Sequence, residues 1–132
     1  MADYYANARS NLFEVKDINA FEKKIEVIDG IELLREGNGV CLLFEEGIID
    51  EYYSEETDSF IKVDWKTIFK KHLKEYQVAV FIESGAEKLR YIVGVAVAYS
   101  WTGEAVWVNL DNIYGLAQEE FGGDAIIDRA EY

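Results

Sequence analysis

The residues with the greatest potential for chemistry are the carboxylates of residues 45–58, EEGIIDEYYSEETD. Seven of these fourteen residues are acidic and none is basic. The acidic residues are Glu45, Glu46, Asp50, Glu51, Glu55, Glu56 and Asp58, and the adjacent Tyr52 and Tyr53 lie between them. Clustered carboxylates can bind a hard cation, attract a basic surface, or simply keep a loop solvated. The spacing of the acids and the composition of the whole chain separate these three possibilities.

The spacing argues against a dedicated metal site. A calcium loop requires acidic residues at alternating positions, a central glycine and a glutamate at its twelfth position. Counted from Asp50, this order fails and the central glycine is missing. His72 is the only histidine, which excludes sites that need two histidines, and no glycine-rich nucleotide motif is present. The sequence therefore predicts no metal and no other cofactor.

Three other positions carry groups that could react. His72 lies on an apolar helical stripe, which is typical of a partly buried structural histidine, with a functional role as the alternative. Cys41 lies in the apolar stretch VCLLF without a charged neighbour in sequence, which is typical of an inert core thiol. Glu83 and Glu87 flank an expected turn and could form an acid–base pair, although surface turns often carry two glutamates. We therefore predict that the protein is not an enzyme.

The net charge of −13 on 132 residues disfavours direct binding to nucleic acid and favours a basic partner. Fully extended, residues 45–58 reach at most about 48 Å, or one charge per roughly 7 Å. Duplex DNA carries one charge per about 1.7 Å, so this stretch alone is too dilute to imitate a duplex. Mimicry would require other acids on the same face. The candidates after residue 90 are Glu104, Asp111, Glu119, Glu120, Asp124, Asp128 and Glu131.

Lysines and tyrosines refine this expectation. Five of the thirteen basic residues gather around one segment, which predicts a polarised molecule: Lys62, Lys66, Lys70, Lys71 and Lys74. Tyr52 and Tyr53 are candidate contact anchors, because tyrosine is enriched at binding hot spots. The alternative is that one tyrosine of the pair faces the core.

The chain has the composition of one folded domain, residues 1–132. Half of its residues are hydrophobic and 14% are aromatic, which excludes a disordered acidic tail. A single cysteine permits no intrachain disulfide, and no apolar run reaches the roughly 18 residues of a membrane span. We expect a cytoplasmic protein without a membrane partner.

Hydrophobic patterns predict the elements that position these residues. A strand is expected at residues 12–15, followed by a helix that Asp17 caps and that buries Ile18, Phe21, Ile25 and Ile28. Strands at 31–34 and 40–44 flank an Asn38–Gly39 hairpin turn. Asp64 caps a second helix, whose stripe is Trp65, Ile68, Phe69, Leu73 and Tyr76.

The rest of the chain is expected to be mostly strand. Strands at 77–82, 89–100 and 105–110 are separated by turns at 83–88 and 100–104, and a helix follows at 111–121, before Gly122 and Gly123. Residues 45–58 are a loop or an edge strand. The order β-α-β-β-α-β-β-β-α predicts an α+β domain: a predominantly antiparallel sheet, with residues 78–82 and 92–98 central, and two to three helices packed on it.

Two stretches together resemble a loosely defined set of small acidic bacterial, plasmid and phage proteins. They are ARSNLFEVKDINAFEK (residues 8–23) and ESGAEKLRYIVGVAVAYSWTGEAVWVNLDNIY (residues 83–114), and they cover about a third of the chain. The set is marked by an SNYF-x-VKD-like opening and an E-x-G-x-EKLRY-x-x-G hairpin. Ala86 stands where several such sequences are expected to carry a histidine, so no function tied to that histidine transfers to this chain.

The association of this set with mobile elements is similar to that of anti-restriction and anti-CRISPR proteins. The resemblance implies a non-enzymatic inhibitor that binds a basic nucleic-acid-binding surface of a host defence complex, such as a CRISPR effector. The acidic stretch and its two tyrosines are the expected partner-binding residues. The alternative is an interaction module of a mobile element that uses an apolar, tyrosine-rich surface for self-association or for another partner.

Overall fold

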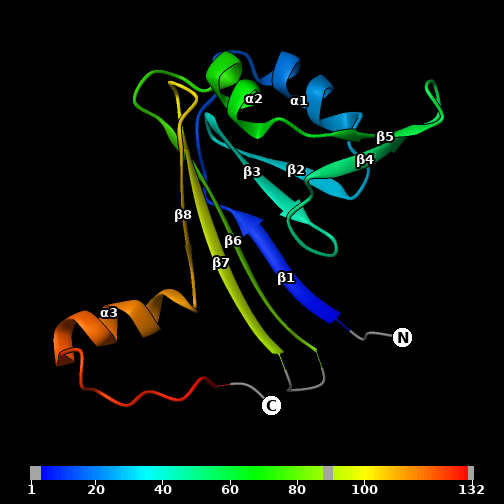
Figure 1. The fold of residues 1–132 in the computed structure, drawn as a ribbon. Helices are drawn as coiled ribbons and strands as arrows, with labels where there is room; N and C mark the ends of the chain where they lie inside the picture. The colour runs from blue at the N-terminus through cyan, green and yellow to red at the C-terminus, as the bar shows by residue number, and fades with distance from the viewer. Residues whose placement is uncertain (1–3, 88–90, 131–132) are drawn as a thin grey trace.

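A six-stranded antiparallel sheet carries two helices over one end of one face (Figure 1). The computed structural model describes residues 4–87 and 91–130. Its elements in chain order are β1 (Tyr4–Ser10), α1 (Ile18–Glu26), β2 (Ile31–Glu36), β3 (Gly39–Phe44), β4 (Glu51–Ser54), β5 (Ser59–Lys62), α2 (Trp65–His72), β6 (Val78–Glu87), β7 (Tyr91–Ser100), β8 (Ala105–Asn109) and α3 (Asn112–Phe121). The main sheet has the order β2-β3-β1-β6-β7-β8, and β4 and β5 form a separate hairpin.

The α+β class, the antiparallel sheet and the order of elements are confirmed. The β4–β5 hairpin is an addition to that order, and it forms from the acidic stretch. β6 and β7 each have two neighbours in the sheet, as expected for central strands. α1 and α2 begin after Asp17 and Asp64 as predicted, and each aspartate accepts a hydrogen bond from a backbone N–H of the first turn.

The first strand lies earlier than the hydrophobic pattern indicates. β1 runs through residues 4–10, whereas Phe13 and Val15 form only isolated bridges, to Val40 and Leu73. β1 lies between β3 and β6 and pairs with both. Two neighbours satisfy its backbone groups, so a polar sequence is stable as a strand in this position.

Two further expectations about boundaries are wrong. α2 ends at His72, and Tyr76 lies outside the helix with a positive φ of 69° and its ring 5.0 Å from that of Trp101. The expected turn at 83–88 is strand as far as Glu87, because residues 83–87 pair with both β1 and β7. The connection to β7, residues 88–90, lies outside the described residues.

An aromatic cluster fills the space between the helices and the sheet. Four phenylalanines are at most 1% exposed: Phe13, Phe21, Phe69 and Phe81. Phe13 and Phe69 pack edge to face with ring centroids 5.5 Å apart, and so do Phe69 and Phe81 at 5.6 Å. Such pairs add to the stabilisation from buried area. The stripes predicted for both helices supply much of this core.

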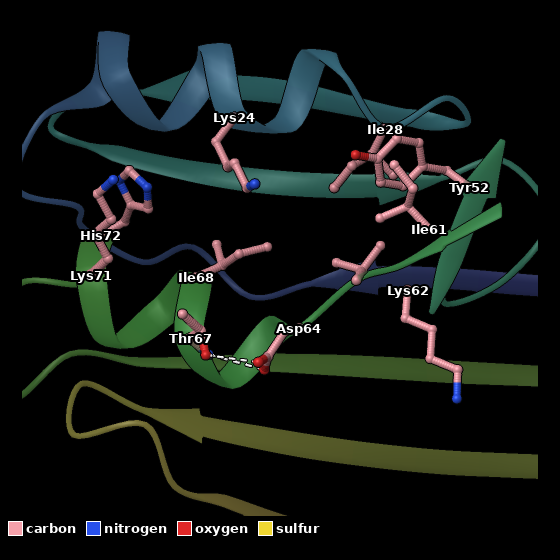
Figure 2. Close-up of a pocket in the computed structure, with 11 residues that line it drawn as sticks. Lys24, Ile28, Tyr52, Ile61, Lys62, Asp64, Thr67, Ile68, Lys71 and His72 are labelled. Carbon is pink, nitrogen blue, oxygen red and sulfur yellow. Dashed lines mark hydrogen bonds between the residues drawn. The ribbon is translucent and has the colours of Figure 1, made fainter. Parts of the chain in front are cut away.

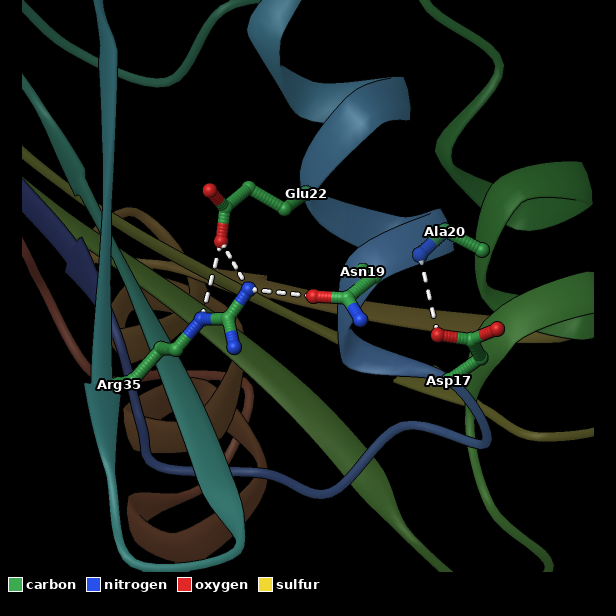
Figure 3. A network of polar contacts seen from close by, with 5 residues as sticks. All are labelled: Asp17, Asn19, Ala20, Glu22 and Arg35. Carbon is green, nitrogen blue, oxygen red and sulfur yellow. Dashed lines mark hydrogen bonds and ion pairs between the residues drawn. The ribbon is translucent and has the colours of Figure 1, made fainter.

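A polar network holds α1 against β2 (Figure 3). Arg35 on β2 donates from Nε and Nη2 to Oε2 of Glu22, at 2.9 and 2.5 Å, and from Nη2 to Oδ1 of Asn19 at 3.0 Å. Because these side chains are solvent-accessible, the network orients the helix more than it stabilises the fold.

The cap of α2 makes stability depend on pH. Asp64 accepts hydrogen bonds from Oγ1 of Thr67 at 2.7 Å and from its backbone N–H at 3.2 Å, and these bonds lower the pKa of Asp64 below its ordinary 3.8. A lowered pKa means that the stabilisation is present above about pH 3.8 and is lost as pH falls through the folded-state value. We expect Asp64→Asn to flatten the acid limb of a plot of melting temperature against pH. An acid limb as steep as that of the wild type would contradict this.

Candidate functional site

The acidic stretch forms an arm that extends beyond the two helices (Figure 1). We call residues 45–62 the acidic arm: an entry loop (residues 45–50), the β4–β5 hairpin, and a tip at residues 55–58. β4 pairs with β5 in the register Glu51 with Lys62 and Ser54 with Ser59. Neither strand joins the main sheet.

All seven carboxylates of the arm are exposed. Asp58 accepts a hydrogen bond from the hydroxyl of Tyr53, and none of the seven lies in an ion pair with another described residue. The bond to Asp58 is the main cause that raises the pKa of Tyr53, so the phenol remains a donor at neutral pH. The carboxylates are therefore free to attract an external cation or a basic surface.

Folding makes the arm denser in charge than the extended stretch. From Asp50 through β4 to Glu56 at the tip the chain advances six steps of about 3.3 Å, so the five acids from Asp50 to Asp58 lie along roughly 20 Å. The spacing becomes about one charge per 4 Å, which lies between the roughly 7 Å of the extended stretch and the about 1.7 Å of duplex DNA. Lys62, opposite Glu51 at the base, offsets one of these charges.

The two tyrosines of the arm differ in environment. Tyr52 is half-buried, packs against the core and lies across from Ile61. Tyr53 is 48% exposed, and its ring lies 5.6 Å from that of Phe60, which is 69% exposed. The alternation of side chains along a strand causes this difference. Tyr53 is therefore available as an anchor together with Phe60, which sequence analysis did not single out.

The later acids do not enlarge the acidic surface of the arm. Asp111, Glu119 and Glu120 belong to α3 or its cap, and α3 lies at the opposite end of the molecule from the arm (Figure 1). Asp124 and Asp128 follow α3 in the chain, and Glu131 lies outside the described residues. Glu104, the remaining candidate, lies in the turn between β7 and β8 and not on the arm. Beside the entry loop, where Glu45 N–H donates to the Gly30 carbonyl, Asp29 adds one further acid.

Specific contacts hold the base of the arm. The indole N–H of Trp65 donates to the Ile49 carbonyl at 2.8 Å, and Ile48 N–H donates to the carboxylate of Glu83 at 2.7 Å. Gly30 has a φ of +91°, and a Cβ there would lie 2.9 Å from Cδ1 of Ile49. Glu83, the candidate acid–base residue, thus supports the arm, while the side chain of Glu87 lies outside the described part.

A pocket of about 290 Å³ lies between α1, α2 and the base of the arm (Figure 2). Its lining consists of Lys24, Ile28, Tyr52, Ile61, Lys62, Val63, Asp64, Thr67, Ile68, Lys71 and His72. Of the five lysines of residues 62–74, Lys62 and Lys71 line this pocket, and Lys74 pairs with Glu14 at 3.1 Å. Lys24 comes from a different helix, so sequence patterns did not indicate the pocket.

Cys41 is buried as predicted, but a charged group lies next to it. Nη2 of Arg9 lies 3.1 Å from Sγ, and the thiol in turn lies 3.3 Å from the carbonyl of Ser10. Arg9 is 32 residues away in the chain, so no local pattern reveals the contact. The thiol is 5% exposed, which fits a structural role.

Among residues 4–87 and 91–130, no group of three or more histidine, cysteine or acidic side chains is arranged to hold a metal ion. The helices within the described ranges are all too short or too polar to cross a bilayer. The chain matches no protein-family model, no curated protein and no solved structure. The function must therefore be inferred from the surfaces of this molecule alone.

Proposed function

We propose that the protein is a non-enzymatic acidic inhibitor from a phage or other mobile element. The acidic arm binds a basic nucleic-acid-binding surface of a host defence complex, such as a CRISPR effector, and blocks access of nucleic acid. The observation that carries this proposal is a projecting acidic arm whose seven exposed carboxylates form no ion pair with another described residue.

Three features of the protein support binding of the arm to a basic surface. Its charge density approaches that of nucleic acid only along the hairpin, so it fits a short basic groove better than a long duplex channel. The net charge of −13 steers encounter with a cationic surface and keeps the chain from nucleic acid. Tyr53 and Phe60 add exposed aromatic contact area at the same place.

Competition with nucleic acid tests the proposal. The protein, immobilised, is presented with purified nucleic-acid-binding effector complexes in their free and nucleic-acid-loaded forms. We expect capture of a free complex, weaker capture of the loaded complex, and affinity that falls steeply with salt, because exposed charges are screened within about 10 Å at 0.1 M. Equal capture of both forms would contradict the proposal.

A different observation favours self-association as a second candidate function. The outer face of β6–β8, opposite the helices, has no charged residue in the described part: Val78, Val80, Ile82, Ser84, Ala86, Ile92, Gly94, Ala96, Ala98, Val106 and Val108. Val106 and Val108 on the edge strand β8 are 65% and 56% exposed. The described residues of α3 are all unburied, and they include Ile113, Leu116 and Phe121. We call β8, α3 and this outer face the apolar surface.

A second copy of the chain fits the apolar surface best. Two chains of charge −13 repel each other overall, and this repulsion is weakest where a neutral surface forms the contact. β2, the other edge of the sheet, is protected by Glu32, Arg35 and Glu36, whereas β8 carries no charge. Antiparallel pairing of β8 about a two-fold axis at Trp107 would place Val106 opposite Val108 of the second copy.

Lysine on β8 should therefore prevent dimerisation. We expect sedimentation equilibrium to show a wild-type dimer that strengthens with salt, because salt screens repulsion between acidic chains. Val106→Lys should weaken the dimer by roughly 100-fold, because it buries an unpaired charge at the interface. Val27→Lys, an exposed valine after α1, is the matched control and should leave the dimer unchanged. A wild-type monomer at about 100 µM would rule out the dimer.

A further inference from the structure

The pocket between α1, α2 and the arm combines basic and apolar walls. Lys24, Lys71 and His72 supply positive or polar groups, and Ile28 and Ile68 supply apolar ones. In Figure 2 the ammonium group of Lys24 and the hydroxyl of Tyr52 point into the space between the elements, whereas Lys62 points away. A cationic pocket is unexpected in a chain of charge −13, because most of its surface repels anions.

His72 is buried in this pocket without a partner for its ring nitrogens. The residue is 7% exposed, its ring lies 5.5 Å from that of Phe21, and its imidazole forms no hydrogen bond with another described residue. No fully buried side-chain nitrogen or oxygen in the described part lacks a hydrogen bond, so the ring nitrogens of His72 keep some accessibility, and the residue lines the pocket. They are therefore able to hydrogen-bond a ligand that enters the pocket.

The charges around His72 favour an anion as that ligand. Burial is the largest cause that lowers the pKa of His72, followed by Lys71, Lys24 and Lys16, with Asp17 opposing them. Asp64 is the only acidic residue of the lining, and its ionised carboxylate, held by Thr67, offsets one lysine charge. Lys24 and Lys71 together outnumber it, so the pocket is a partly desolvated space with a net positive charge.

We propose that this pocket binds a small organic oxyanion, a phosphate monoester or a carboxylate with a compact apolar body. Lys24, Lys71 and His72 would contact the charged head, and Ile28, Ile61 and Ile68 would contact the body. The volume of about 290 Å³ is at the small end of ligand sites, which limits the body to about the size of one ring. This site is independent of the partner proposed for the acidic arm.

His72 provides the direct measurement, because a chain with one histidine gives one unambiguous imidazole signal in NMR. Phenyl phosphate or benzoate should shift this signal saturably and raise the midpoint of its pH titration, because a bound anion stabilises the imidazolium. By linkage, affinity should rise as pH falls through that midpoint. Inorganic phosphate, which lacks the body, and benzyl alcohol, which lacks the charge, should each bind at least about tenfold more weakly.

Variants distinguish anion binding in the pocket from non-specific attraction of the anion by the lysine charges of the surface. Lys24→Gln and Lys71→Gln should each weaken phenyl phosphate or benzoate about tenfold. Lys66→Gln removes the same charge from α2 at a position outside the lining, and it should change affinity less than twofold. The proposal is overturned if neither anion binds at about 10 mM, if benzyl alcohol binds equally well, or if Lys66→Gln matches Lys24→Gln. These outcomes are measured on the isolated chain, so failure of the inhibitor proposal does not affect them.

Discussion

Replacing Phe69 with alanine is expected to lower the free energy of unfolding by about 3–5 kcal/mol, the largest loss of stability that we predict for a single substitution. The side chain is fully buried, and five aromatic rings have centroids within 5.3–6.2 Å of its own: Phe13, Phe21, Trp65, Phe81 and Tyr99. Removing the ring leaves a cavity that packed neighbours on two helices and two strands cannot close. Urea unfolding followed by tryptophan fluorescence measures this loss.

Phe60→Ala is the matched control, because it removes the same side chain from the exposed face of the arm. Phe60 is 69% exposed, and among the described residues its ring pairs only with that of Tyr53. We expect a loss below about 1 kcal/mol, which is the scale of one exposed aromatic pair. Similar losses for Phe60→Ala and Phe69→Ala would contradict the assignment of the core.

Reversing charges on the acidic arm is expected to abolish partner binding. Glu46→Lys, Glu55→Lys and Glu56→Lys together replace three exposed carboxylates that form no hydrogen bond or ion pair with another described residue. Each reversal exchanges an attraction for a repulsion at a basic surface, so we expect at least about a 100-fold loss of affinity at low salt. Unchanged binding with an intact fold would exclude the arm as the binding surface.

The control must carry the same net charge. Glu119→Lys, Glu120→Lys and Asp124→Lys change the net charge equally, but on and just after α3, at the end of the molecule opposite the arm (Figure 1). We expect this variant to slow association modestly through the overall field and to retain most of the affinity. Equal losses in the two triple variants would mean that the net charge, and not the arm, determines binding.

Local sequence patterns predicted the structure well where the stabilising interactions join residues only a few positions apart. Asp17 and Asp64 cap helices through bonds to residues three positions later, and apolar spacing placed Phe21 and Phe69 in the core. A two-residue turn joins β2 and β3, but it lies at Gly37–Asn38, one position before the expected Asn38–Gly39, because Gly37 takes the positive φ of 59° and Gly39 already pairs with Glu36. β1 was misplaced, because a polar strand between two neighbours is stabilised by pairing that its own sequence does not reveal.

The sequence by itself determined the α+β class, both capped helices, the acidic charge and the position of the seven clustered carboxylates, because these depend on composition and on neighbours within a few residues. Only the tertiary structure decided how charge and apolar area are distributed. It folded the acidic stretch into a projecting hairpin, placed the acids of α3 at the other end, and brought Lys24 of α1 to the pocket that Lys71 and His72 of α2 also line. These arrangements bring together residues that are far apart in the chain, so tertiary packing determines them and local sequence patterns do not reveal them.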